Sequence, residues 1–146
     1  MKVVAYGIKS FEKKFLAVAN QKKHDITLIA NTCSEETCLF AEGKKAIILC
    51  SNHTLSAAII QKLAQFGIRY ILLLRASAVV IDTSAIVAND IQLFDLSAYA
   101  PAAIEEQIID TAIETSKRIL ENEALRTIET LDNCENEQLK SLHGLR

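Results

Sequence analysis

Histidine and cysteine supply the side chains that most often bind metals or act as nucleophiles, and this chain has three histidines and four cysteines. The cysteines show neither C-x-x-C nor zinc-ligand spacing, so we expect free thiols in a reducing compartment. The histidines also lack metal-ligand spacing, and we expect them at the surface. No Cys–His or Ser–His–Asp arrangement can be assigned from these positions. The residues are Cys33, Cys38, Cys50, Cys134, His24, His53 and His143.

Polar side chains follow the third predicted strand, as Ser51-Asn52-His53. A parallel sheet places its binding site at the carboxyl ends of its strands, so Ser51 and Asn52 are candidate ligand-binding residues, and His53 lies in the same loop. A phosphorelay receiver would need a phosphoacceptor Asp there and acidic residues after the first strand. The first strand is instead followed by Gly7-Ile8-Lys9-Ser10, which also lacks the Ser/Thr/Gly cluster that holds a flavin phosphate.

Glycine spacing excludes the common nucleotide-binding loops. The four glycines are too far apart for G-x-G-x-x-G or for G-x-x-x-x-G-K. We therefore expect no cofactor site within these residues.

Length, composition and charge fit one globular domain. The chain has 146 residues, of which 50% are hydrophobic, and a net charge of −2 with both signs interspersed. This balance favours neither a nucleic-acid partner nor an acidic membrane surface. No apolar run reaches the roughly 18 residues of a membrane span, and no signal-like segment is present, so we expect a cytoplasmic protein.

Short apolar runs alternate with helical patterns along the chain, which predicts a flavodoxin-like α/β domain with a five-stranded parallel sheet and helices on both faces. Ser10 is expected to cap the first helix, and Thr32 to Glu35 to form a capping box. The expected strands are 2–6, 25–30, 45–50, 70–74 and 91–96. The expected helices are 10–21, a short one that the Thr32–Glu35 box opens and that ends at 41, 54–66, 84–89 and a long C-terminal helix over 101–125.

The long helix has an apolar arc about twice as wide as contact with one sheet needs. Its second apolar stripe lies either in a deep groove of its own domain or on something outside the domain. For the second case we expect a homodimer or partner chain through helix 101–125, or the 126–146 segment folded over it. That segment is polar, and we expect a turn at 132–136 and a short helix at 138–143.

Several stretches of the chain resemble the D-2-hydroxyacid dehydrogenase superfamily, and D-lactate dehydrogenases most of all. The resemblance runs in order from about residue 1 to residue 120. The matching stretches are Met1 to Gly7, Phe11 to Leu16, Gly67 to Arg75, Val80 to Asp82 and Ala98 to Glu106.

This resemblance implies a substrate domain over 1–100, followed by an interdomain helix over 101–125. In the family, a second domain binds NAD and supplies the catalytic residues, so none is assigned here. Backbone amides after the Tyr70–Arg75 motif hold the substrate carboxylate in the family, which implies roles for Ser77, Ala78 and Val79. The family's glycine is missing from this loop. Tyr99 matches a tyrosine that reaches the same carboxylate.

Three functions remain open at this point. The chain is an isolated substrate domain that is inactive alone, a stand-alone module that binds a small 2-oxo or 2-hydroxy acid or another protein, or one half of a split NAD-dependent oxidoreductase. A ligand screen separates the second from the first, and activity on mixing with a nucleotide-binding partner identifies the third.

Overall fold

The computed structural model describes residues 1–74, 79–96 and 123–144. Within these ranges lies a five-stranded parallel sheet of β1 (Lys2–Tyr6), β2 (Asp25–Ile29), β3 (Ala46–Leu49), β5 (Tyr70–Leu73) and β7 (Gln92–Asp95), in the order β2-β1-β3-β5-β7. This is the flavodoxin-like strand order, so the predicted fold class is confirmed.

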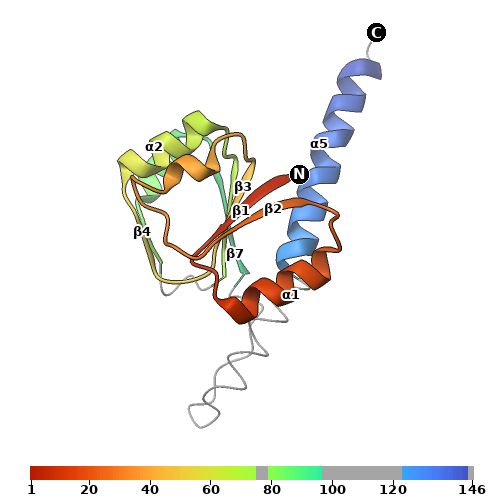
Figure 1. The fold of residues 1–146 in the computed structure, drawn as a ribbon. Coiled ribbons are helices and arrows are strands. Elements are labelled where there is room, and N and C mark those ends of the chain that lie inside the picture. Colours follow the sequence, from red (N-terminus) through yellow and green to blue (C-terminus); the bar gives the residue numbers. More distant parts are fainter. Residues whose placement is uncertain (75–78, 97–122, 145–146) are drawn as a thin grey trace.

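The central strands are apolar throughout because helices cover both faces of the sheet. All four residues of β3 are fully buried. One face packs against η1 (Cys38–Ala41), α2 (Ala57–Phe66) and α3 (Thr83–Ala88), and the other against α1 (Ser10–Asn20) and α5 (Leu125–Gly144). Figure 1 shows α2 on one side of the sheet and α1 and α5 on the other.

A second, two-stranded parallel sheet was not expected from the sequence. It pairs β4 (His53–Leu55) with β6 (Val79–Ile81), with His53 opposite Val79. The predicted helix from Thr54 is therefore wrong at its start, because Thr54 lies in β4 and the helix begins at Ala57. Ser56 is its N-cap, and the Ser56 hydroxyl accepts a hydrogen bond from the Ile59 amide. Gly67 ends α2 with a φ of 112°, as its position predicts.

Two other predicted caps differ in detail. Lys9, not Ser10, is the N-cap of α1, and its backbone amide donates to Glu12 Oε1 at 3.0 Å. In place of the Thr32–Glu35 box, Ser34 and Thr37 exchange backbone-to-hydroxyl hydrogen bonds of 2.8 and 3.3 Å. This tight turn leaves only the single 3₁₀ turn of η1 before β3.

The C-terminal segment differs most from its prediction. The expected turn at 132–136 is wrong, because α5 continues from Leu125 to Gly144 without a break. Ala124 and Ile128 are fully buried in the core on the α1 side of the sheet. The apolar stripe predicted for helix 101–125, and the dimer predicted from it, fall on residues 101–122, outside the described residues.

An acidic stripe on α5 crosses the amino ends of four strands. Glu129 contacts Lys23 and His24 just before β2, each at 3.0 Å. Asp132 lies 3.4 Å from the amino group of Met1 before β1. Glu135 lies 3.6 Å from Lys45 before β3 and accepts a hydrogen bond of 3.1 Å from Tyr70 at the start of β5.

The rise along α5 between successive acidic residues is close to the distance between neighbouring strands of the sheet. Three residues of α-helix rise about 4.5 Å, and neighbouring strands are about 4.8 Å apart. Acidic residues at every third position therefore meet successive strand ends. The buried Ile128 fixes the depth of the helix, and the stripe fixes its register along the sheet edge.

Candidate functional site

The strand order creates one crevice at the carboxyl edge of the sheet. The chain turns in opposite directions after β1 and after β3, and in open α/β sheets ligands bind where this reversal occurs. Gly7 follows β1, and Ser51, Asn52 and His53 follow β3. The amide of Gly7 donates to the Asn31 carbonyl just beyond β2, at 2.9 Å, and this joins the loops after β1 and β2.

Gly7 is needed because two side chains lie directly against its Cα. Its φ is +69°, and a Cβ placed there would overlap the Ser51 hydroxyl and lie 3.0 Å from Cε1 of His53. Only glycine combines this backbone conformation with the missing side chain. The loop after β3 is thereby brought against the loop after β1.

An open crevice of about 750 Å³ lies beside these residues. Its polar lining comes from Thr32, Ser34, Asn52, His53 and Thr54, and its apolar lining includes Ile59 and Val80. The wall is therefore formed by the loop after β2, the loop after β3 and the β4–β6 pair. A lining that combines hydroxyl and amide groups with apolar side chains suits a small polar ligand.

His53 is buried, which corrects the prediction that all histidines are surface residues. It is 4% exposed, and its Nδ1–H donates to the Ser51 carbonyl at 2.7 Å. Burial lowers the pKa of His53 below its ordinary 6.5, which favours the neutral ring. Within the part of the chain that the structure describes, Nε2 of His53 has no hydrogen-bond partner.

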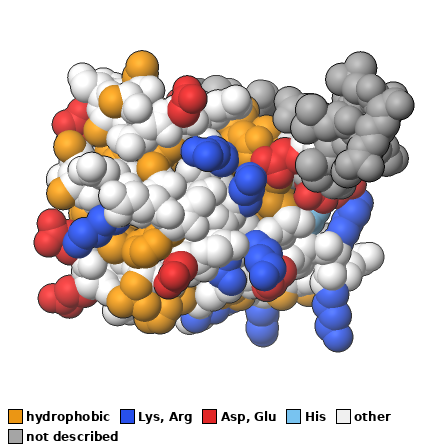
Figure 2. Space-filling view, turned by 90° about the horizontal axis from the view of Figure 1, so that it is seen from above, with side chains coloured by type: hydrophobic (Ala, Val, Ile, Leu, Met, Phe, Trp, Pro, Cys, Tyr) orange, Lys and Arg blue, Asp and Glu red, His pale blue; other side chains and the backbone are white. Residues whose placement is uncertain are grey.

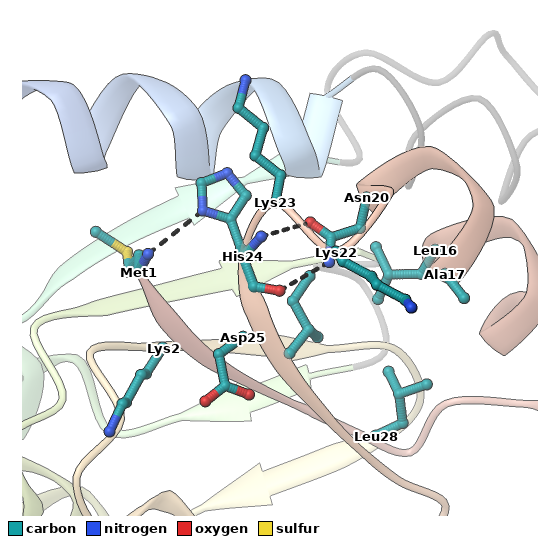
Figure 3. A pocket seen from close by; sticks show the side chains of 11 residues that line it. Met1, Lys2, Leu16, Ala17, Asn20, Lys22, Lys23, His24, Asp25 and Leu28 are labelled. Carbon is teal, nitrogen blue, oxygen red and sulfur yellow. Dashed lines mark hydrogen bonds between the residues drawn. The ribbon is translucent and has the colours of Figure 1, made fainter.

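His24 is also buried, at the opposite end of the sheet. Its ring lies between Glu129 and the amino group of Met1, and its backbone exchanges hydrogen bonds of 2.8 and 3.0 Å with Asn20. Figure 3 shows it beside a second cavity of about 630 Å³. The lysine side chains lining that cavity, Lys2, Lys22 and Lys23, point in different directions, so they form no common anion site (Figure 3).

The cysteines are free, as their spacing predicts, and three of them are buried. Cys33 lines the crevice, but burial raises the pKa of its thiol to about 12. Burial likewise raises the pKa of Tyr6, whose hydroxyl donates to the Thr37 carbonyl at 2.7 Å. Among the described residues, no group of three metal-ligand side chains lies together. Neither metal chemistry nor thiolate chemistry is therefore assigned to this crevice.

The structure brings part of the predicted site together. Asn52 lines the crevice, Ser51 beside it lies against Gly7, and Val79 is joined to the same loop by the β4–β6 ladder. Ser77, Ala78 and Tyr99 lie outside the described residues. From the sequence, His53 is only a further candidate in this loop and Gly7 has no assigned role, although a glycine directly after a buried strand is a signal for close approach.

Most of this chain is similar in sequence to part of known dehydrogenases. A 2-hydroxyacid dehydrogenase homolog of Haemophilus influenzae is 28% identical over 120 residues, which are 82% of this chain and 36% of that protein. The D-lactate dehydrogenase of Escherichia coli is 26% identical over the same shares. The chain is similar, over most of its length, to part of a D-2-hydroxyacid dehydrogenase.

Solved structures of D-lactate dehydrogenases share the fold. The apo enzyme of Escherichia coli matches with a TM-score of 0.60 at 24% identity, over 65% of this chain and 30% of that chain. The enzyme of Treponema pallidum matches with a TM-score of 0.65 at 13% identity, over 92% and 40%. The chain thus spans about a third of the length of the dehydrogenases it matches. No protein-family model matches it.

The surface agrees with the mixed charge of the sequence. Basic and acidic side chains lie close to one another on the face of the molecule seen in Figure 2. Among the described helices, none is long and apolar enough to span a membrane.

Proposed function

We propose that this chain is the substrate-binding part of a D-2-hydroxyacid dehydrogenase, and that its crevice between the loops after β2 and β3 holds the carboxylate of a small 2-oxo or 2-hydroxy acid. The observation that carries the proposal is the contact of the Ser51–His53 loop with Gly7 beside an open polar crevice. The similarity to D-lactate and 2-hydroxyacid dehydrogenases over the same residues supports the choice of ligand.

In this proposal Ser51 and Asn52 supply a hydroxyl and an amide donor to the carboxylate. Backbone amides at Ser77 to Val79 and the hydroxyl of Tyr99 complete the carboxylate site. Hydride transfer further needs NAD, and the sequence has no glycine-rich loop to bind it. Redox activity therefore depends on a nucleotide-binding domain outside these 146 residues, and we expect the 146-residue chain alone to be inactive.

Thermal unfolding with added D-lactate or pyruvate tests the binding step. At ten times Kd, binding to the folded state adds about 1.4 kcal/mol, which raises Tm by about 3–6 °C for a chain of this size. The double variant Ser51→Ala/Asn52→Ala is expected to lose this shift. Thr130→Ala, which removes an exposed hydroxyl on α5, is the matched control and keeps it. A shift that survives in the double variant would contradict the proposed site.

A further inference from the structure

The ring of His53 makes one hydrogen bond, through Nδ1, and its other nitrogen has no partner among the described residues. A carbonyl oxygen can only accept, so the 2.7 Å contact with Ser51 places a hydrogen on Nδ1. In the neutral ring, Nε2 then carries a lone pair and acts as an acceptor. Within the described residues that acceptor has no donor, although His53 is only 4% exposed.

A buried acceptor without a donor is rare in folded proteins, and each case calls for a partner such as a ligand, an ion or an ordered water. His53 lines the crevice of the proposed carboxylate site together with Asn52 and Thr32. Its Cε1 lies against Gly7, at the point where the β1 and β3 loops meet. Because His53 lines the crevice, a ligand there could supply the missing donor.

The chemistry of this nitrogen selects among ligands. A neutral imidazole nitrogen with a lone pair binds a hydroxyl group and gains nothing from a ketone oxygen, because both would be acceptors. A 2-hydroxy acid and the matching 2-oxo acid have the same carboxylate and differ in this one donor. His53 can thus distinguish the two oxidation states of the same small acid.

We propose that Nε2 of His53 accepts a hydrogen bond from a hydroxyl group of the bound acid, so that this domain binds the 2-hydroxy acid more tightly than the 2-oxo acid. The proposal rests on the proposed function, since it needs an acid in the crevice. Because Nε2 is shielded from water in the structure, this contact requires the ring to turn toward the crevice on binding, about its Nδ1–H bond to Ser51.

The test compares D-lactate with pyruvate on the 146-residue chain at pH 7.5. One neutral hydrogen bond is expected to give D-lactate a tighter Kd by about 3- to 10-fold in a calorimetric titration. The ¹⁵N resonance of His53 Nε2 is expected to move upfield with D-lactate and to stay in place with pyruvate. This spectroscopic reading uses the unmodified protein, so it does not depend on any variant folding.

His53→Asn is the informative variant, because its side-chain amide retains a donor for the Ser51 carbonyl and removes Nε2. We expect it to bind the two acids with equal affinity, while His24→Asn, at the other end of the sheet, keeps the preference for D-lactate. Equal affinities and an unchanged Nε2 resonance in the unmodified chain would overturn the role of His53 and leave the carboxylate site standing. Absence of binding by either acid would overturn the proposed function, and the role of His53 with it.

Discussion

Among the described side chains of α5, Ile128 is the most deeply buried. Its side chain is fully buried against the α1 face of the sheet. Truncation to alanine removes apolar contacts and leaves a cavity, at a cost of about 2–5 kcal/mol. That is a large share of the roughly 5–15 kcal/mol by which a domain is stable. We expect Ile128→Ala to lower the free energy of unfolding by an amount in this range.

The acidic stripe on the same helix contributes less to the free energy of unfolding than Ile128 does. Glu129 and Lys23 are 34% and 63% exposed in their side chains, and exposed ion pairs are worth at most about 1 kcal/mol. Glu129→Gln is therefore expected to cost less than Ile128→Ala. Its effect should shrink further in 0.5 M salt, because salt screens exposed charges.

Urea unfolding followed by circular dichroism measures both variants, with the exposed Arg126→Ala as the control on the same helix. Limited proteolysis adds a local reading, because a detached α5 is cleaved before the sheet. The reasoning fails if Glu129→Gln destabilises the chain as much as Ile128→Ala does, or if Ile128→Ala costs less than about 0.5 kcal/mol, the scale of an ordinary surface substitution.

Three further predictions concern the crevice and the thiols. Gly7→Ala should destabilise the chain more than Gly43→Ala in urea unfolding. Both sites have positive φ, which costs a residue with a side chain about 1–2 kcal/mol, but only Gly43 has open space around it. Equal losses of stability would contradict the contact of Gly7 with Ser51. Because the pKa of His53 is lowered in the folded chain, the unfolded chain binds more protons. The free energy of unfolding should therefore fall as the pH drops through 6.5 toward the folded pKa, by at most about 1.4 kcal/mol per pH unit. A His53→Asn chain whose unfolding midpoint has the same pH slope would refute this. Cys134 is exposed and should react with a thiol reagent within seconds at pH 8. Cys33 is buried with a pKa of about 12 and should react only on unfolding. A Cys134→Ser chain that keeps the fast reaction would disprove the assignment.

The five main strands could be predicted from the sequence because each is a short run containing apolar residues between helical patterns. The central strands are also covered on both faces, as in the fully buried Ala46–Leu49. The β4–β6 pair could not be predicted. Each of its strands has three residues, too few for an alternating apolar pattern to be recognised. The pair depends on contacts such as that of His53 with Val79, 26 positions along the chain.

The unbroken course of helix α5 could not be predicted for a related reason. Its sequence is polar, and among its described side chains only Ile128 is fully buried. The partners of Glu129 and Glu135 lie 105 and 65 positions away in the sequence, which no local pattern reveals. The buried His24 follows the same rule, because its ring is bonded to Glu129, 105 positions away.

The central claim is that a small 2-hydroxy or 2-oxo acid binds at the carboxyl edge of the sheet. A ¹H–¹⁵N correlation spectrum of the 146-residue chain titrated with D-lactate locates the ligand directly. We predict that the largest shifts occur at Gly7, Ser51, Asn52 and His53. Shifts that instead centre on His24 and Lys23, at the amino edge, would contradict the account.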